Sequence, residues 1–410
     1  MPKHYVIIGA GQAGRRMAES LREHDTAAQI SLVGAEPELP YDRPALSKDG
    51  LLSEQALSEA FVVPAQFYTE QRIDVYVNTE ATSIDPTQRQ VHLSDGRILS
   101  YDDLILCTGS RVRHLDLPGA QSAPLHYIRT MEDCRALRSA ATHKKNVVII
   151  GGGFIGLEVA ATLKAHFDCQ VTVLENGSRI LQRTMPAPVS QFVHELHESK
   201  GVQIHLNTHI ESLAQRDAHT TAVLTNHGIF EADLIVVGIG VHPNQELAAA
   251  AGVKVNNGIV VDAQGRTSVP HIYASGDVTA HTNPYYDKPV RLESWQVAEH
   301  HPAVIAEHLH ALPSSYQELP WLWSDQYDCS MQMLGDFNYA NSIHRRQEAD
   351  PNRFAWIGLD AEQRLKAVCT VNQGRDMSLY KRLMSSAKPI SAELITDSSQ
   401  SLRDLQKALV

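Results

Sequence analysis

The chain has 410 residues, of which 43% are hydrophobic, so it can bury a sizeable core in each of two or three domains. Its net charge of −11 and the lack of any Lys/Arg run argue against nucleic acid as a partner, and no apolar run is long enough to span a membrane. The five cysteines show no CxxC spacing and the 21 histidines repeat no zinc signature, so we expect a reduced, cytoplasmic protein without a metal.

The first predicted element is a strand at residues 5–8, early enough to leave no room for a signal peptide. It runs into a glycine-rich turn, a helix at residues 15–23, a strand at residues 30–33 and then Glu36. In such a dinucleotide fingerprint the glycines permit a tight turn, close approach of backbone to a pyrophosphate and packing of helix on strand. The acid accepts the ribose hydroxyls. The turn spans the six residues 9–14 and includes Gly9, Gly11, Ala13 and Gly14.

The chain then leaves this unit and returns to it. Residues 40–48 form a proline-bounded loop that carries Arg43 and Lys48. These cations could belong to an ordinary surface loop or neutralise a pyrophosphate and sit over a flavin, and the spacing alone leaves both open. Strand-like hairpin segments are predicted at residues 74–78, 82–85 and 90–93, and a turn follows at residues 94–96. An apolar strand at 101–107 ends in a glycine turn at 108–110 and is expected to return to the first sheet.

A second, complete fingerprint spans residues 147–175. Its strand, helix and second strand are predicted at residues 147–150, 157–167 and 171–174. Its turn contains Gly151, Gly153 and Gly156, and Glu175 follows nineteen residues later. Two fingerprints imply two dinucleotides, and FAD with NAD(P)H is a pair whose redox chemistry fits together. The alternative is that one copy is a structural duplicate that has lost its ligand.

Further elements alternate in the same way. A helix is predicted at residues 192–200, with strands at residues 202–206, 221–225 and 232–237. The last of these ends in a turn at 238–244 that echoes the turn at 108–110. A strand at 272–278 runs through Gly276 into Asp277, whose carboxylate could accept a ribityl hydroxyl or cap the next turn.

The last part of the chain is predicted to be a small α/β domain. A helix that follows residues 291–296 runs to about residue 312, and a segment at 320–326 with two tryptophans marks a boundary. Strands are predicted at residues 331–334, 354–359 and 365–371, with helices from residue 379. We therefore predict an α/β protein with two Rossmann-like dinucleotide-binding domains and a small C-terminal α/β domain. The predicted domains are an FAD-binding domain at 1–110 and 241–319, an NADH-binding domain at 111–240 and a C-terminal interface domain at 320–410.

Together these motifs resemble the FAD- and NADH-dependent ferredoxin reductases, a family of glutathione-reductase-like architecture that includes putidaredoxin reductase, rubredoxin reductase and the reductase components of aromatic-ring dioxygenases. The segments that carry the resemblance are GAGQAG, YDRPALSK, TGSR, IRTMED, GGGFIGLE, GIGVHPN, SGDV, RLESWQ and WSDQY, in family order over nearly the whole chain. The chain departs from the family pattern at Cys107, where alanine is usual, and at residues 300–302, where small residues are usual.

The resemblance implies a role for each motif residue. Non-covalent FAD would be bound by Gly9, Gly11, Ala13, Gly14, Glu36, Arg43, Lys48, Ala81, Thr108, Gly109, Arg129, Gly276, Asp277 and Trp295. NADH would be bound by Gly151, Gly153, Phe154, Ile155, Gly156, Glu158, Glu175, Arg183 and Gly240. At the reacting centre, Lys48 would stabilise charge on the reduced flavin and Glu158 would lie near the nicotinamide amide. Trp295 would lie by the isoalloxazine and Trp323 where an iron–sulfur partner docks.

The implied function is hydride transfer from NADH to FAD, followed by transfer of single electrons to a [2Fe–2S] ferredoxin. That ferredoxin would feed a ring-hydroxylating dioxygenase or a cytochrome P450, as in aromatic hydrocarbon catabolism. Glu175 predicts NADH over NADPH, because a carboxylate accepts both ribose hydroxyls and repels a 2′-phosphate. Arg179 and Arg183 weaken this prediction, since arginine can accept a 2′-phosphate. The sequence leaves open whether the chain is a monomer or a homodimer, and which cations dock the partner, among Arg43, Arg113 and Arg291.

The positions of the cysteines distinguish a ferredoxin reductase from related enzymes that use thiols. Disulfide reductases of the superfamily need a cysteine pair beside the flavin, and related NADH oxidases and peroxidases use one cysteine soon after the first fingerprint acid. The loop at 41–48 has none, and Cys107 is expected to be a core residue. Two rivals remain: a small-molecule or monodehydroascorbate-type reductase, which would share every motif, and a redox-sensing flavoprotein like apoptosis-inducing factor. The short chain, without a targeting segment or basic surface, argues against the second rival.

Overall fold

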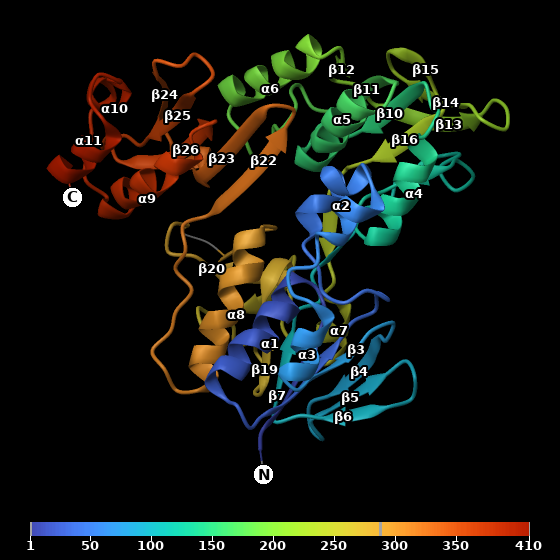
Figure 1. The fold of residues 1–410 in the computed structure, drawn as a ribbon, viewed down its shortest axis with the longest axis vertical. Helices are drawn as coiled ribbons and strands as arrows, with labels where there is room; N and C mark the ends of the chain where they lie inside the picture. The colour runs from blue at the N-terminus through green and yellow to red at the C-terminus, as the bar shows by residue number, and fades with distance from the viewer. Residues whose placement is uncertain (1, 287–288, 410) are drawn as a thin grey trace. The chain divides into compact units, whose positions relative to one another are not determined.

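A computed structural model describes residues 2–286 and 289–409 of the chain (Figure 1). Contacts divide the described chain into two compact units. The first takes in Met1–Ala45, Gln55–Arg111 and Val241–Glu318, and the second takes in Leu46–Glu54, Val112–Gly240 and Leu319–Val410. No helix in the described ranges is both long and apolar enough to cross a membrane.

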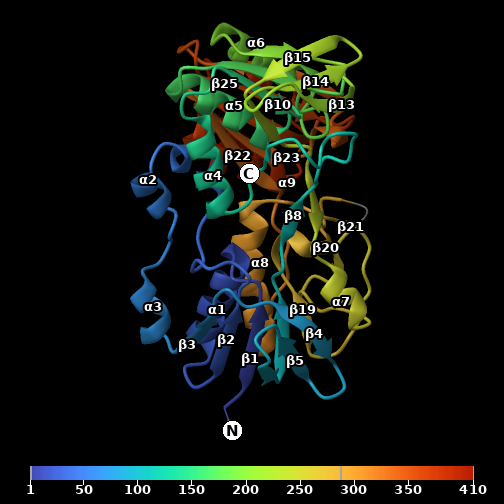
Figure 2. The same ribbon diagram turned by 90° about the vertical axis from the view of Figure 1, so that its right-hand side faces the viewer.

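A five-stranded parallel sheet forms the centre of the first unit, in the order β19-β7-β1-β2-β3. Its strands are β1 (His4–Ile8), β2 (Gln29–Val33), β3 (Ile73–Tyr76), β7 (Asp103–Leu106) and β19 (Ile272–Ala274). In β1, β2 and β7 all or all but the first residue are buried, because both faces of the sheet are covered. Helices α1 (Gln12–His24) and α8 (Trp295–Leu309) lie side by side (Figure 1, Figure 2), and Met17, Leu21 and Ile305 pack with the sheet residue Ile7.

The other face of this sheet carries smaller elements. Val6 and Leu104 pack there with Val91 and Ile259. The elements are an antiparallel sheet of β4 (Ala81–Asp85), β5 (Gln90–Leu93) and β6 (Ile98–Ser100), and a sheet of β18 (Ile259–Val261), β20 (Thr279–Thr282) and β21 (Pro289–Val290), with helix α7 (Glu246–Ala250). The remaining elements of this region are α2 (Glu54–Ser58), α3 (Ala65–Glu70), and the paired strands β8 (Ser110–Val112) and β17 (Val241–Pro243).

The second unit repeats the parallel arrangement. Its five-stranded sheet has the order β12-β11-β10-β16-β9, with the strand before the glycine turn at the centre, as in the first unit. The strands are β9 (Leu125–His126), β10 (Asn146–Ile150), β11 (Gln170–Leu174), β12 (Gln203–His205) and β16 (Leu234–Val237). The accompanying elements are α4 (Met131–Ala141), α5 (Phe154–His166), α6 (Ala187–Ser199) and the antiparallel strands β13 (Ile210–Gln215), β14 (Thr221–Thr225) and β15 (Gly228–Ala232).

An antiparallel sheet of order β22-β23-β26-β25-β24 completes the second unit. Its elements are β22 (Trp321–Gln326), β23 (Cys329–Gly335), β24 (Ser342–Gln347), β25 (Phe354–Leu359), β26 (Leu365–Val371), α9 (Met377–Ser386), α10 (Ala392–Thr396) and α11 (Leu402–Leu409). One set of its side chains packs with the helices α9–α11, and another packs with Leu157 of α5 and Val189 and Val193 of α6. The C-terminal sheet therefore shares a core with the second nucleotide fold.

The structure confirms both strand–turn–helix segments and corrects several boundaries. The predicted strand at 232–237 is broken at Asp233, whose carboxylate accepts the backbone N–H groups of Lys145 and Asn146. The predicted strand at 272–278 ends at Ala274, because Gly276 has φ of 79° and begins a 3-10 turn. Helix α8 ends at Leu309 rather than near residue 312. The segment read as a boundary at 320–326 contains strand β22, and β24 was not predicted at all.

Candidate functional site

The N-terminal glycine turn packs tightly against backbone and leaves the first amides of α1 without a side-chain cap. Gly9 has φ of 110°, and a Cβ there would lie 2.1 Å from the carbonyl oxygen of Cys107. A Cβ on Gly14 would lie 1.9 Å from the carbonyl oxygen of Gly9, so only glycine lets α1 pack on the turn. Gly11 is the N-cap residue of α1, which has no side-chain cap and no acidic residue in its first turn. The first amides of the helix are therefore available to a phosphate.

An ion pair lies beyond the carboxyl end of β2, the strand next to β1 in the sheet. Arg43 donates from Nη2 to Glu36 over 2.5 Å, and Tyr41 donates its hydroxyl to the other carboxylate oxygen over 2.5 Å. Burial lowers the pKa of Arg43, but Tyr41, Glu36 and Asp277 outweigh it and raise the pKa, so the guanidinium stays charged. The structure thus brings Glu36, Arg43 and Asp277 within electrostatic reach of one another.

Two further turns meet this edge of the first sheet, because parallel strands end on the same side. A Cβ on Gly276 would lie 2.8 Å from the Cβ of Ala13, so the turn that carries Asp277 passes close to α1. The hydroxyl of Thr108 donates to the carbonyl of Asn244 over 2.7 Å, and the Asn244 side chain donates back to the Thr108 carbonyl over 2.8 Å. The carbonyl of Gly109 accepts the Asn244 backbone N–H over 2.9 Å.

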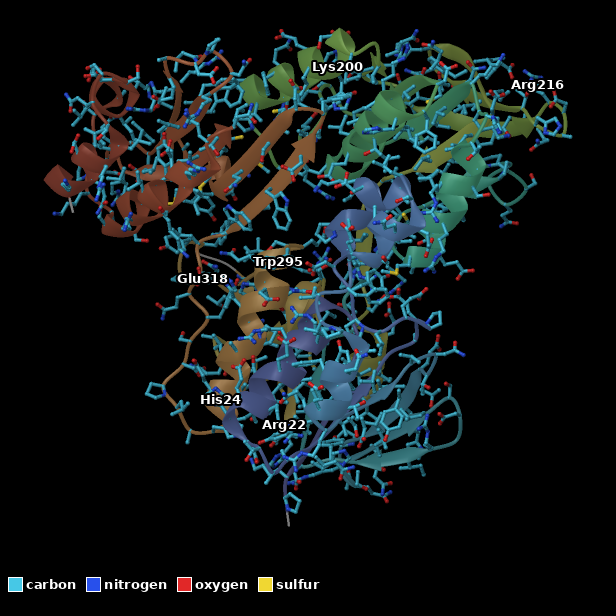
Figure 3. The ribbon with its side chains drawn as sticks, viewed as in Figure 1. Arg22, His24, Lys200, Arg216, Trp295 and Glu318 are labelled. Carbon is cyan, nitrogen blue, oxygen red and sulfur yellow. The ribbon has the colours of Figure 1, made fainter. Side chains whose placement is uncertain are left out.

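Trp295 begins helix α8 (Figure 3). Its indole Nε1 donates to the carboxylate of Asp42 over 3.3 Å, and burial raises the pKa of Asp42. Ala81 is the first residue of β4, beside a bulge, and packs on the core of the first unit. Arg129, by contrast, lies in the second unit, where its backbone N–H donates to Asp133 over 3.0 Å at the start of α4. The FAD role that the resemblance gives to Arg129 stays a prediction.

The second glycine turn has the same design as the first. Gly151 has φ of 107°, and a Cβ there would lie 2.4 Å from the carbonyl oxygen of Gly238. A Cβ on Gly156 would lie 2.2 Å from the carbonyl oxygen of Gly151. Gly153 is the N-cap residue of α5, which has no side-chain cap. Apart from its chain neighbours and the helix backbone, no described residue lies within 4 Å of the position of its Cβ. This turn also leaves helix amides to a phosphate, and both turns fit a dinucleotide.

Glu175 is fixed beside this second turn. One carboxylate oxygen accepts the backbone N–H of Gly152 over 2.7 Å, and the other accepts that of Gly177 over 2.6 Å. Of the two nearby arginines, Arg179 donates to the carbonyl of Met185 over 2.5 Å and to Ser190 over 2.6 Å, so its guanidinium holds the loop together.

Arg183 is placed differently from Arg179. It is exposed, and its Nη1 lies 3.6 Å from the position of a Cβ on Gly240, which has φ of 103°. In the first turn of α5, Phe154 packs on the shared core while Ile155 is 48% exposed. The structure thus places an exposed cation and an exposed apolar side chain in the second unit with Glu175.

A buried carboxylate lies at the centre of the second unit. Glu158 of α5 is only 4% exposed. It accepts the hydroxyl of Ser47 over 2.5 Å and that of Ser324 over 2.7 Å, and Lys48 Nζ lies 3.3 Å from it. Burial raises the pKa of Glu158, and the charge of Lys48 opposes that rise. The loop at 40–48 is divided between the two units: Arg43 belongs to the first unit, and Lys48 belongs to the second.

Lys48 links this carboxylate to the C-terminal sheet. Its ammonium lies 5.6 Å from the ring centre of Trp323 and 3.8 Å from the Asp325 carboxylate. The rings of Trp321 and Trp323 stack with centres 5.1 Å apart. Sequence reasoning missed Ser47 and Ser324, whose neighbours Lys48 and Trp323 were singled out. The only signal for them was their position inside the YDRPALSK and WSDQY segments.

The cysteines are not placed for thiol chemistry. All five are buried and free. Burial raises the pKa of Cys134 to about 11 and that of Cys329 to about 12, and it also raises the pKa of Cys107. A thiol with such a raised pKa supplies almost no nucleophilic thiolate at neutral pH. Cys107 belongs to the core of the first unit, as predicted.

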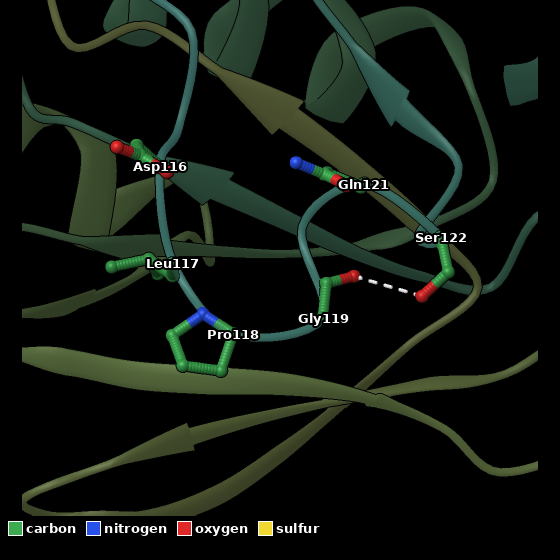
Figure 4. Close-up of a pocket in the computed structure, with 6 residues that line it drawn as sticks. All are labelled: Asp116, Leu117, Pro118, Gly119, Gln121 and Ser122. Carbon is green, nitrogen blue, oxygen red and sulfur yellow. Dashed lines mark hydrogen bonds between the residues drawn. The ribbon is translucent and has the colours of Figure 1, made fainter.

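A surface hollow on the loop before β9 takes no part in these sites (Figure 4). It is lined by Asp116, Leu117, Pro118, Gly119, Gln121 and Ser122. The hydroxyl of Ser122 donates to the carbonyl of Gly119 over 3.1 Å. None of these residues was predicted to contact a cofactor.

Comparisons with known proteins agree with this geometry. The family described as pyridine nucleotide-disulphide oxidoreductase matches residues 3–301, and that described as reductase C-terminal matches residues 321–406. The ferredoxin–NAD(+) reductase component of the anthranilate 1,2-dioxygenase system of Burkholderia cepacia is 44% identical over 97% of this chain and 98% of its own length.

Solved structures show the same likeness. The ferredoxin reductase for the CYP199A2 system of Rhodopseudomonas palustris has a TM-score of 0.94 at 34% identity and covers 100% of both chains. The covalent putidaredoxin reductase–putidaredoxin complex has a TM-score of 0.94 at 35% identity and covers 99% of both chains. The family and fold class predicted from the sequence are confirmed. The chain belongs to the pyridine nucleotide-disulphide oxidoreductases and, within them, to the ferredoxin reductases.

Proposed function

We propose that this chain is an NADH-dependent ferredoxin reductase that delivers electrons singly to a [2Fe–2S] ferredoxin serving an oxygenase. One observation carries the proposal: two glycine cradles, each with its acid, occur in a chain whose five cysteines are buried thiols. Two dinucleotides supply a redox pair, and no thiol is placed to take the electrons onward. The relatives named for dioxygenase and cytochrome P450 systems support the choice of acceptor.

Residues of the first unit would hold FAD. The amides at the start of α1 would bind the pyrophosphate, with Gly9 and Gly14 allowing the turn and the helix to pack closely. Glu36 would accept the adenosine ribose, and Asp277 would accept the ribityl chain. Arg43, already paired with Glu36, would neutralise phosphate charge. Bound FAD supplies the chemistry, which is acceptance of a hydride and release of its electrons one at a time.

Residues of the second unit would hold NADH. The start of α5 would bind its pyrophosphate, and Glu175 would accept both hydroxyls of the ribose. Because Arg179 is used within its own loop, only Arg183 of the two arginines is available to a 2′-phosphate. Glu158 would accept the nicotinamide amide, and Lys48 would hold positive charge beside it. The position of Glu175 and the use of Arg179 within its own loop favour NADH over NADPH.

The domain division follows from the same assignment. Residues 1–110 and 241–319 would form the FAD-binding domain, 111–240 the NADH-binding domain and 320–410 the C-terminal interface domain. The division of the described chain into two units supports the discontinuous FAD domain. The free state of all five cysteines supports a cytoplasmic location. The protein would act as a monomer or homodimer, and Trp323 would mark the partner's docking side.

The test is NADH oxidation by the purified yellow protein with and without a [2Fe–2S] ferredoxin coupled to cytochrome c. We expect strong ferredoxin-dependent cytochrome reduction and slow oxygen use. Fast oxygen consumption, or no gain from several ferredoxins together with rapid reduction of a quinone or monodehydroascorbate, would overturn the proposal in favour of a small-molecule reductase.

A further inference from the structure

The ionised form of Glu158 needs more support than its direct neighbours provide. The side chain is almost completely buried, and an ionised carboxylate in such a place is costly unless hydrogen bonds and charges compensate it. Ser47, Ser324 and Lys48 supply three donors. A carboxylate has about four acceptor positions, so one is left for a ligand.

Ser324 is itself held by a chain of buried side chains. The Gln326 amide donates from Nε2 to the Ser324 hydroxyl over 3.0 Å, and its Oε1 lies 2.8 Å from Nε2 of His197 in α6. Ser324, Gln326 and His197 are each at most 1% exposed. Ser324 and Gln326 are two positions apart on β22, so they share one side of the strand, between α5 and α6.

With the Gln326 amide placed as it is, the hydrogen bonds of this chain can all run in one direction. A carbonyl oxygen only accepts, so His197 must carry its proton on Nε2 and donate to Gln326. Nδ1 then accepts the Tyr327 hydroxyl, 3.3 Å away. Ser324, which accepts from Gln326, has its own proton free to donate to Glu158. All four donors then point toward the carboxylate, an arrangement that fits a neutral His197 and an ionised Glu158.

The surrounding charges agree with this assignment. Burial lowers the pKa of His197 and outweighs the hydrogen bond to Gln326, which raises it, and the nearby His194 lowers it further. Lys48, with Asp325 beside it, is the charged group next to Glu158. At the far end, Lys200 (Figure 3) lies 5.5 Å from the Tyr327 ring centre and 3.5 Å from Asp328. None of these charged groups replaces a donor of the chain at Ser324, Gln326 or His197.

We propose that Gln326 and His197 are positioning residues for the nicotinamide: through Ser324 they fix Glu158 as an ionised acceptor turned to receive the amide N–H of NADH. This inference rests on the proposed function, because it takes the role of Glu158 from there. The donors of this chain can all run toward a carboxylate that keeps one acceptor position for a ligand. That direction supports a binding role and not only a packing role.

The experiment compares two nucleotides on the FAD-loaded enzyme and its variants. Tetrahydro-NAD keeps the carboxamide but cannot transfer hydride, so titration gives a dissociation constant. In the acetylpyridine analogue of NAD a methyl ketone replaces the amide, so it has no N–H for Glu158. The variants are Ser324→Ala, Gln326→Leu, His197→Phe and the conservative His197→Gln, whose amide can still donate to Gln326. His194→Gln, on the same helix but paired with Glu198, is the matched control.

We expect Ser324→Ala, Gln326→Leu and His197→Phe to bind tetrahydro-NAD about tenfold more weakly, the loss of one hydrogen bond to a charged group. His197→Gln and His194→Gln should bind it as the wild type does. All should bind the acetylpyridine analogue with unchanged affinity. Nitrogen-15 NMR of the wild type should show His197 as the neutral Nε2–H tautomer at neutral pH.

Wild-type affinity in the three variants would overturn the proposal, as would equal weakening of the acetylpyridine analogue, which would mean general damage to the site. An Nδ1–H tautomer or a charged His197 would also overturn it. If His197→Phe does not fold, Ser324→Ala, which removes a single oxygen, still decides the question. A wild type that binds neither nucleotide would overturn the proposed use of NADH itself, a result distinct from normal binding that the variants leave unchanged.

Discussion

Replacing Glu175 with alanine is predicted to remove most of the preference for NADH over NADPH. The carboxylate is held by the backbone amides of Gly152 and Gly177, at 2.7 and 2.6 Å, so its position is set before a ligand arrives. In the wild type it would accept two ribose hydroxyls of NADH and oppose the 2′-phosphate of NADPH. The alanine variant loses both effects at once.

The size of the change follows from these contacts. A hydrogen bond to a charged group contributes about 1.5–3 kcal/mol. Glu175 is partly exposed, so we discount the pair of ribose bonds to about 2 kcal/mol, which is a roughly 30-fold rise in KM for NADH. Like charges 4 Å apart repel by about 4 kcal/mol per unit charge at an effective dielectric constant of 20. Relief of only part of that repulsion brings the fall in the NADH-to-NADPH ratio of kcat/KM to about 100-fold or more.

The assay is steady-state reduction of ferricyanide with each nucleotide. Glu175→Gln is the second variant, because it keeps the size of the side chain and an acceptor oxygen for one of the two backbone amides while it removes the charge. Glu198→Ala, at a carboxylate that is 56% exposed on α6, is the control and should leave both KM values unchanged. A Glu175→Ala enzyme that folds, binds FAD and retains the full preference for NADH would refute the reasoning.

Three further predictions address other parts of the structure. Gly9→Ala should yield protein without bound flavin, because a Cβ there meets backbone at 2.1 Å and φ is 110°, and the absorbance near the flavin maximum reports this. Lys48→Met should slow reduction of the flavin by NADH about tenfold or more in stopped flow, since the buried Glu158 loses its cation. Stability should fall as the pH decreases from about 6.5 toward 4, because burial lowers the pKa of His281 to about 4 and that of His301 to about 3.

The sign of the acid effect follows from where protons bind first. The unfolded chain takes up protons on these histidines near their ordinary pKa, and the folded chain does so only at lower pH, so acid favours unfolding. Within the described part of the chain, all four ring nitrogens of His281 and His301 are buried and have no hydrogen-bond partner. Urea unfolding at several pH values should show a smaller acid loss in His301→Phe. An equal loss of unfolding free energy in that variant would contradict the assignment to these histidines.

For the Lys48 prediction, Lys200→Met is the control. A Lys48→Met enzyme whose flavin is reduced as fast as that of Lys200→Met would contradict the role of Lys48.

Sequence reasoning found the features that local chemistry dictates. The glycines at 9, 14, 151 and 156 are required where a Cβ would strike backbone, so the turn, its helix and the following acid can be read from one short segment. Each parallel strand beside those turns is a continuous apolar run, which a buried sheet needs.

Features that depend on pairing between distant segments were harder to predict. Ser47 and Ser324 lie 111 and 166 residues from Glu158, and only the folded chain brings their hydroxyls to it. Strand β24 contains His344, Arg345 and Arg346, and the last is buried because it donates to three backbone carbonyls of the C-terminal segment. The sequence of β24 shows no alternation of apolar and polar residues that would predict a strand. The division of residues 40–48 between two units likewise depends on tertiary contacts.

The central claim is that one hydride from NADH leaves as two single electrons. The most direct measurement is the anaerobic stoichiometry with a [2Fe–2S] ferredoxin in excess, followed at the absorbance of its cluster while NADH is added in known amounts. We expect two reduced ferredoxins for each NADH consumed. Oxidation of NADH with the ferredoxin left oxidised, in an enzyme whose flavin is reduced normally, would contradict it.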